Sequence, residues 1–313
     1  MIKIAFEGGL GNQMFQYTMG RYLQLKFNEP VTYDISRYIF ENDEIRDFEL
    51  LNFNMDPSWS KAPSDKSRQK RFGISYLAYC AFTWIYLKLN ADRFLHYKPL
   101  RLPKTYNAII NRLGHYRVHF NNYETPRRYS WTKTINVRGM WFWMDMAREM
   151  RPIIKNELTV RTPISDLNRN TLDMIRSTYS VGVHIRRGDY VKLGLIVCDI
   201  NYYQQCIRRM ASELKDPVFF IFSDDIEWVR ENLNIPDGIS VIYVDNNNSS
   251  SDDMRLLSNC AHFIMSNSTF SWWGAFLGDH PDKKVYVPKY WTHRNHQSLF
   301  ALPEWTIIDN RNL

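Results

Sequence analysis

Short apolar runs alternate with amphipathic segments through the second half of the chain. The runs are rich in β-branched and aromatic residues, as buried parallel strands are, and the segments between them repeat apolar positions at helical spacing. The expected strands are Val181–Ile185, Val218–Phe222, Ile239–Val244, Ala261–Met265 and Val285–Val287. The expected helices are Asn201–Leu214, Ile226–Leu233, Ser251–Cys260 and Thr269–Leu277. This alternation predicts a parallel, doubly wound sheet.

The first half of the chain begins with a similar unit and then loses its regularity. A strand is expected at Ile2–Phe6, then a glycine-rich turn, a helix that ends near Phe27 and a strand at Val31–Asp34. Residues 35–60 show no clear period. Residues 61–130 are basic and irregular around an uncharged run, Gly73–Leu87.

These patterns divide the chain into two α/β domains. We predict an N-terminal domain over residues 1–160, with a basic aromatic insert at about 61–130, and a C-terminal Rossmann-like domain over residues 161–313. Loops at the strand ends of two such domains make a ligand site between them. The predicted fold class is therefore α/β, with two Rossmann-like domains that face a cleft.

Composition excludes several classes of protein. Of the 313 residues, 44% are hydrophobic and 23% are charged, which is ordinary for a folded globular chain and excludes a disordered or fibrous one. The four cysteines form no CxxC pair, so a zinc ribbon or thioredoxin-type site is not expected. We expect reduced, mostly buried thiols, no metal and no cofactor.

The positive charge is concentrated in one segment. The chain carries 40 lysines and arginines against 33 acids, a net charge of +7, which invites an anionic partner. Residues 61–130 contain 14 lysines and arginines and 3 acidic residues, a net charge of +11. The rest of the chain contains 26 lysines and arginines and 30 acidic residues, a net charge of −4. Two interpretations of the segment stay open. It is a solvated surface around a core helix, or a face that docks on an anionic membrane.

The sequence also bears on localisation. Its first residues are typical of a strand rather than of a signal peptide, and no apolar run reaches the ~18–20 residues that span a bilayer. We expect a cytoplasmic protein, with peripheral contact at the inner membrane if residues 61–130 dock there.

Two arginines follow the first strand of the C-terminal domain, in the run His184 to Tyr190. Ligands bind outside the carboxyl ends of parallel strands, and arginine grips phosphate oxygens in a bidentate way. Arg186 and Arg187 are therefore candidates for phosphate binding. The alternative is a salt-bridge cluster at a strand end.

Polar residues also follow two neighbouring strands. Ser223, Asp224 and Asp225 come after Val218–Phe222, where they either cap a helix or accept hydrogen bonds from ribose hydroxyls or a guanine edge. Hydroxyls at 266, 268, 269 and 271 open the helix that begins at Thr269. A helix start donates free N–H groups to anions, so these hydroxyls suit a phosphate. The alternative is a multiply capped helix start.

The glycine-rich turn at Gly8–Gln13 matches neither GxGxxG nor a P-loop. On its own such a turn is weak evidence of a ligand site. Asn12 and Gln13 project from the start of the following helix towards whatever lies opposite.

At these residues the sequence resembles the α-1,2-fucosyltransferases of glycosyltransferase family 11, bacterial branch. The resemblance rests on four ordered motifs and covers about residues 1–35 and 135–295. The motifs are Gly9–Tyr17, His184–Val191 (HxRRxD), Phe222–Asp225 and Ser266–Gly274. Pro288 and Trp291 match a closing Pro/Trp pair.

The resemblance implies a GT-B fold and metal-independent transfer of fucose, with inversion, from GDP-fucose to the 2-hydroxyl of a galactose in a glycan. It also implies that the domain at 1–160 lies on the acceptor side and that the domain at 161–313 binds the nucleotide sugar. Position by position, it implies that Arg186 and Arg187 hold the diphosphate and that His184 lies near the phosphate or ribose. It also implies that Ser223 and Asp224 bind the nucleoside. Further donor contacts are implied for Ser268, Thr269, Ser271 and, from the other domain, Asn12.

A catalytic base for the acceptor hydroxyl is less clear. Asp189, Glu7 and Asp145 are candidates, with Asp189 preferred. The alternative role of Asp189 is a salt bridge that orients Arg187.

Three other functions are compatible with part of the sequence. A nucleotide-sugar-binding protein without catalysis is disfavoured by the intact Arg186, Arg187 and Asp189. A nucleic-acid-binding protein would suit the charge and the aromatic content, but no helix-turn-helix, RRM or zinc-finger spacing is present, and we expect no nucleic-acid partner. A related glycosyltransferase with another donor or linkage stays open.

Overall fold

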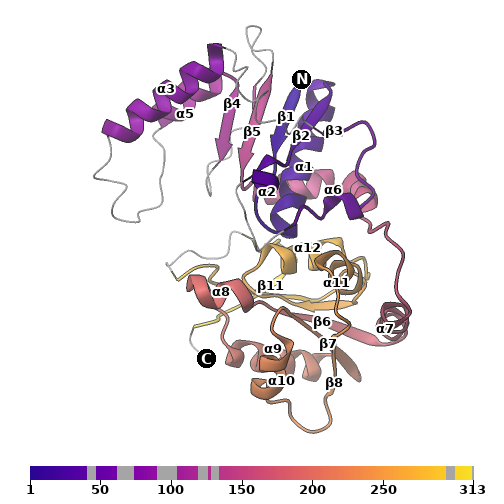
Figure 1. The fold of residues 1–313 in the computed structure, drawn as a ribbon. Coiled ribbons are helices and arrows are strands. Elements are labelled where there is room, and N and C mark those ends of the chain that lie inside the picture. Colours follow the sequence, from indigo (N-terminus) through magenta and orange to yellow (C-terminus); the bar gives the residue numbers. More distant parts are fainter. Residues whose placement is uncertain are drawn as a thin grey trace. The chain divides into compact units, whose positions relative to one another are not determined.

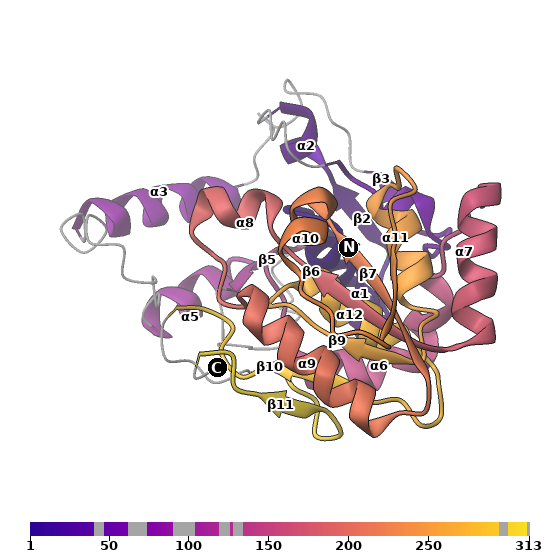
Figure 2. The same ribbon diagram turned by 90° about the horizontal axis from the view of Figure 1, so that it is seen from below.

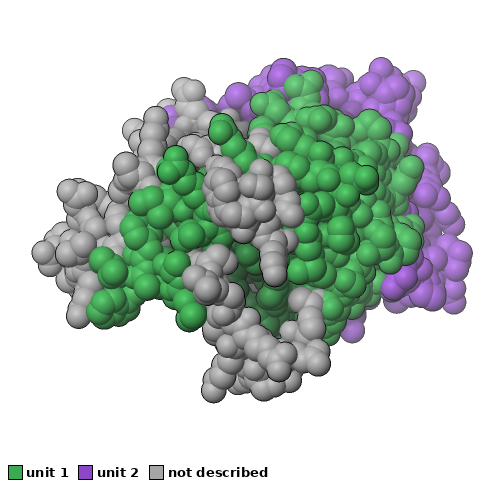
Figure 3. All heavy atoms as spheres, turned by 90° about the horizontal axis from the view of Figure 1, so that it is seen from above, with its two compact units in different colours: residues 1–158 green, residues 159–313 purple. Residues whose placement is uncertain are grey.

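The computed structural model describes residues 1–40, 47–61, 74–89, 104–118, 126–127, 134–293 and 300–311. Much of the basic segment at 61–130 therefore lies outside the described residues. The chain divides into two compact units, unit 1 (Met1–Leu158) and unit 2 (Thr159–Leu313), which Figure 3 colours separately.

Unit 1 is built on a parallel sheet in the order β3-β2-β1-β5-β4 (Figure 1). Its strands are β1 (Ile2–Ala5), β2 (Val31–Asp34), β3 (Ser60–Lys61), β4 (His115–Val118) and β5 (Ile135–Gly139). Its helices are α1 (Leu10–Phe27), α2 (Ser36–Phe40), the 3₁₀ turn η1 (Leu50–Asn52), α3 (Ile74–Leu89), α5 (Lys104–Arg112) and α6 (Met144–Glu157).

A polar cluster joins α1 to α6. Arg21 pairs with Glu157 at 2.7 Å and with Asp56 at 2.6 Å, and the Tyr17 hydroxyl donates to Glu157 at 2.6 Å. Burial and this hydrogen bond raise the pKa of Tyr17, so the phenol stays protonated. The cluster fixes α1, and with it the glycine-rich turn.

Unit 2 is built on a second parallel sheet, in the order β11-β10-β9-β6-β7-β8. Its strands are β6 (Tyr179–Ile185), β7 (Pro217–Ser223), β8 (Ser240–Tyr243), β9 (His262–Ile264), β10 (Val285–Pro288) and β11 (Thr306–Ile308). Its helices are α7 (Asp166–Ser177), α8 (Gly188–Leu193), α9 (Ile200–Glu213), α10 (Ile226–Asn232), α11 (Ser250–Leu257) and α12 (Thr269–Leu277).

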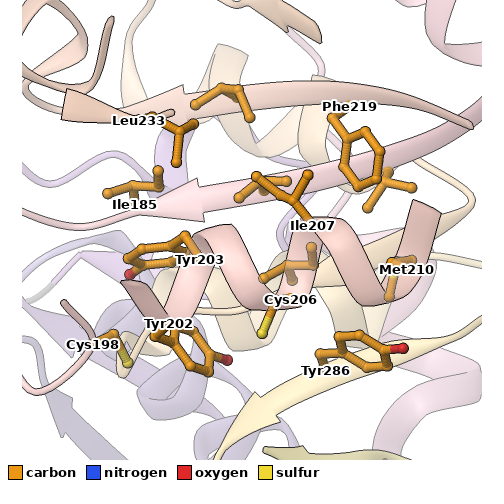
Figure 4. Packing of buried hydrophobic residues seen from close by; sticks show 14 of the residues in the cluster. Ile185, Cys198, Tyr202, Tyr203, Cys206, Ile207, Met210, Phe219, Leu233 and Tyr286 are labelled. Atoms are coloured by element: carbon orange, nitrogen blue, oxygen red, sulfur yellow. The ribbon is translucent and has the colours of Figure 1, made fainter. Parts of the chain in front are cut away.

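Helix α9 closes one face of this sheet. Its inward side chains, Tyr202, Tyr203, Cys206, Ile207 and Met210, are almost wholly buried and pack with residues of β6, β7 and β10 (Figure 4). Burial of each large apolar side chain stabilises the fold by about 1.5–3 kcal/mol. This packing holds β6 and β7 firmly where their carboxyl ends meet the loops described below.

The structure corrects one expectation and decides against one of the two interpretations left open above. Val285–Val287 is not the last strand, because Thr306–Ile308 adds β11 beside β10. The run Gly73–Leu87 does give a helix, α3, but not a core helix, since Leu77 is 58% exposed and Trp84 60% exposed. Three cysteines are buried, as expected, whereas Cys80 on α3 is exposed. No helix in the described part of the chain has the length and apolarity to cross a membrane.

Candidate functional site

The candidate site lies at the carboxyl ends of β6, β7 and β9. Ile185, the last residue of β6, is in register with Ser223, the last residue of β7, and Val183 is in register with Ile264, the last residue of β9. The chain segments that leave these three strands therefore emerge at one edge of the sheet, as parallel pairing requires. We call Arg186, Arg187, Asp189, Asp224 and Asp225 the arginine site.

Arg186 is held from two sides. Its Nη2 lies 2.7 Å from Asp189 Oδ1, and its Nη1 lies 2.9 Å from Asp224 Oδ2. The side chain of Asp189 is 7% exposed, whereas that of Arg186 is 26% exposed. The guanidinium is thus fixed by carboxylates and keeps an edge towards solvent.

Arg187 has different partners. Its backbone N–H donates to Asp224 Oδ1 at 2.8 Å, and its Nε donates to Asp225 Oδ2 at 3.0 Å. The guanidinium carbon lies 3.2 Å from the centre of the Trp228 ring. The alternative role of Asp189, a salt bridge to Arg187, differs from the pairs in the structure, where Asp189 pairs with Arg186 and Asp225 pairs with Arg187.

Asp224 joins the two arginines through its two oxygens. Gly188 makes room for it, because a Cβ at Gly188 would lie 2.6 Å from Asp224 Oδ2. Ser223 shapes the same turn by accepting a hydrogen bond from the backbone N–H of Asp225 at 3.1 Å. The sequence allowed Asp225 to cap α10. In the structure its side chain makes no capping hydrogen bond and pairs with Arg187.

The arginine site carries a net charge of −1, because three carboxylates surround two guanidinium groups. Attraction of an anion to this place therefore depends on directed N–H groups rather than on net local charge. Guanidinium N–H donors suit phosphate oxygens in this way. Among the described residues no group of three His, Cys, Asp or Glu side chains could hold a metal ion.

His184 points into unit 2. Its Nδ1 lies 2.6 Å from Ser271 Oγ and 3.2 Å from Ser266 Oγ, and its ring packs against Phe270. Burial, helped by the charge of Arg186, lowers the pKa of His184 to about 3, so the imidazole is neutral. His184 and Ser271 thus tie β6 to α12.

The hydroxyls at the start of α12 differ in exposure. Ser268 is buried and caps the helix by accepting a hydrogen bond from the N–H of Phe270 at 3.2 Å. Ser271 is 2% exposed, whereas Thr269 is half-buried. The donor contacts expected of Ser268, Thr269, Ser271 and His184 stay predictions, and Thr269 has the most accessible side chain of the four.

Asn12 and Glu7 belong to unit 1. Asn12 lies in the first turn of α1, against Gly8, whose φ of 79° favours glycine. Glu7 pairs with Arg37. The expected reach of Asn12 to the donor stays a prediction.

Sequence reasoning missed three contributors, Trp228, Tyr190 and the ion-pairing role of Asp225. Trp228 follows Asp225 by three positions on α10, and Tyr190 follows Arg186 by four, with its ring 5.6 Å from that guanidinium. The sequence did hold a signal for the two aromatic residues, because each lies one helical turn after a charged residue at a strand end.

Comparison with known proteins identifies a family. The sequence model described as "Glycosyl transferase family 11" matches residues 114–309. An α-1,2-colitosyltransferase of Escherichia coli is 30% identical, over 96% of this chain and 97% of its own. The galactoside α-(1,2)-fucosyltransferase 2 of Bos taurus is 29% identical, over 61% of this chain and 58% of its own.

A solved structure has the same fold. The crystal structure of the fucosyltransferase NodZ from Bradyrhizobium aligns with a TM-score of 0.52 and 15% identity, over 88% of this chain and 92% of that one. At this identity the likeness concerns the fold alone. It confirms the predicted α/β class of GT-B type.

Proposed function

Because the chain belongs to glycosyl transferase family 11, we propose that this glycosyltransferase moves L-fucose from GDP-fucose to the 2-hydroxyl of a galactose in a glycan acceptor. Two relatives support the linkage, since the names of the colitosyltransferase and the galactoside fucosyltransferase both specify an α-1,2 bond. The second name also supports fucose as the sugar and a galactoside as the acceptor.

The observation that carries the proposal is the pair of carboxylates, Asp189 and Asp224, that holds the Arg186 guanidinium in place. Departure of GDP from C1 of the sugar leaves negative charge on the diphosphate. A guanidinium already fixed by Asp189 and Asp224 stabilises that charge without reorganising during the reaction. Attack by the acceptor oxygen from the opposite face of C1 inverts the configuration there, while the C1–O bond to the diphosphate breaks.

Asp189 suits a positioning role better than that of a base. Its carboxylate is 7% exposed and is committed to the Arg186 guanidinium at 2.7 Å. We therefore propose that it holds Arg186, and that the proton of the acceptor hydroxyl passes to water as the C1–O bond to the acceptor forms.

The first test replaces Arg186. Arg186→Ala should lower the kcat for fucose transfer by about a hundredfold or more, because a charge-stabilising group acts mainly in the transition state. The fold should persist, since the Arg186 side chain lies at the edge of unit 2. Radiolabelled transfer from GDP-fucose to a galactoside measures the rate, and a thermal melt checks the fold. A folded variant within tenfold of the wild-type rate would contradict the assignment.

Colitosyl transfer is the second candidate. It is favoured by the colitosyltransferase, which aligns over nearly the whole chain. A panel of GDP-fucose, GDP-colitose and UDP-sugars, each offered with galactosides, separates the two. Faster transfer from GDP-colitose would replace fucose as the sugar, and GDP binding without any transfer would indicate a binding protein.

A further inference from the structure

Helix α3 carries an exposed apolar stripe. Leu77, Trp84 and Ile85 are 58%, 60% and 48% exposed, and the spacing of 77, 84 and 85 places them on one helix face. Cys80 and Ala81 are exposed on the same face between them. We call these five residues the α3 stripe. Figures 1 and 2 both show α3 extending beyond the sheet of unit 1.

The chemistry of α3 suits the surface of a bilayer. Over its 16 residues, Ile74–Leu89, the sequence has a single charged residue, Lys88. The large exposed members of the stripe are one tryptophan and two aliphatic residues, a combination found where helices lie in a membrane interface. Such a helix is too short to span the bilayer, so it would lie on the surface.

The charge of the surrounding sequence indicates which kind of partner covers the α3 stripe. Residues 61–130 carry a net charge of +11 against −4 for the rest of the chain. A second copy meeting the first through α3 would bring two such basic segments together, whereas an anionic lipid surface attracts them. At an anionic membrane, hydrophobic contact and electrostatic attraction act in the same direction.

We propose that the α3 stripe docks unit 1 on membranes that contain anionic phospholipid. Bound in this way, the protein would meet acceptors that are carried on membrane lipid. Vesicle binding needs neither donor nor acceptor, so this proposal and the proposed function can fail independently.

The test is co-sedimentation of the full chain with vesicles. Phosphatidylcholine vesicles are compared with vesicles of phosphatidylcholine and phosphatidylglycerol, at low and at high salt. We expect binding only with phosphatidylglycerol, and weaker binding as salt screens the lipid charge. The triple variant Leu77→Ser/Trp84→Ser/Ile85→Ser should bind at least about tenfold more weakly. Trp84→Ser alone should give part of that loss.

A matched control uses another exposed apolar pair. Leu167 and Met174 on α7 are 63% and 40% exposed and also lie seven positions apart, so Leu167→Ser/Met174→Ser should bind vesicles like the wild type. Thermal melts check that each variant is folded. Undiminished binding by the triple variant, or wild-type binding that is indifferent to phosphatidylglycerol, overturns the proposal. So does a wild-type dimer, seen by sedimentation velocity, that the triple variant turns into a monomer.

Discussion

At the scale of single residues, the two arginines are fixed by different means. Arg186 lies between two carboxylates, whereas Arg187 lies on the Trp228 ring with one carboxylate at its Nε. An aromatic face leaves the edge of a guanidinium open for hydrogen bonds while it restricts the plane of the group. Trp228 therefore orients Arg187 without competing for its donors.

Removal of the Trp228 ring should weaken donor binding. A cation–π contact contributes about 0.5–2 kcal/mol, so Trp228→Leu should raise the KM for GDP-fucose about two- to thirtyfold, with a smaller effect on kcat. Trp228→Phe keeps a ring in place and should restore most of the affinity. Steady-state kinetics at varied donor concentration measures both constants.

A second arginine–aromatic pair provides the control. Arg230, also on α10, lies 4.7 Å from the Tyr243 ring, outside the arginine site. Tyr243→Leu should leave the KM for the donor near the wild-type value. Equal increases in KM for Trp228→Leu and Tyr243→Leu would mean that the ring acts only through the stability of α10.

At the scale of elements, β6 and α12 are joined through a buried, neutral histidine. In the unfolded chain His184 titrates near its ordinary pKa of 6.5, whereas in the fold its pKa is lowered to about 3. Above pH 6.5 neither state binds the proton, and the contribution of His184 to stability is complete. Between pH 6.5 and 3 the unfolded state alone takes up the proton, so stability falls as the pH falls.

Acid should therefore destabilise the protein in a way that depends partly on His184. In the wild type, His184 should lower the free energy of unfolding by a few kcal/mol, in order of magnitude, between pH 6.5 and 3. His184→Gln, whose amide can still hydrogen-bond Ser271, should lack this contribution. Urea unfolding at a series of pH values measures the slope. His115 and His262, whose pKa values burial lowers to about 4, add to the decline in both proteins. Identical slopes would show that His184 does not contribute.

The regular elements were predictable where a pattern repeated. Val31–Asp34 and Thr269–Leu277 have the bounds that the apolar spacing predicts. Strand β11 was missed because Thr306–Ile308 is short and largely exposed at a sheet edge, so it carries no buried pattern. For the uncharged run around α3, the sequence left a core helix and a docking face both open, because composition does not distinguish a buried apolar helix from an exposed one.

Within the arginine site, sequence indicated the residues but not their pairing. Arg186, Arg187 and Asp224 stand at strand ends, which the strand pattern locates. Which carboxylate pairs with which guanidinium depends on the register of β6 with β7 and on the rotamers of Asp224 and Asp225. The spacing of residues in the sequence determines neither of these.

At the scale of the whole molecule, every member of the arginine site belongs to unit 2. A fragment of residues 159–313 should therefore bind GDP without unit 1, although we expect no transfer from it. Saturating GDP should raise the Tm of the fragment by several degrees, because a ligand that binds only the folded state stabilises it. Differential scanning fluorimetry measures the shift. A folded fragment that GDP leaves unchanged, beside a full chain that responds, would mean that the nucleotide needs unit 1.

The hydrogen atom that serves as the side chain of Gly188 also restricts how this sequence can change over generations. A methyl group there would lie 2.6 Å from an oxygen of Asp224, which could retreat only by giving up its bonds to Arg186 and to the backbone of Arg187. A single substitution at Gly188 or at Asp224 thus breaks the bonds from Asp224 to Arg186 and to the backbone of Arg187. Another way of holding Arg186 requires simultaneous changes in the two loops that follow β6 and β7. Lineages that keep Arg186 held in this way should therefore keep both residues.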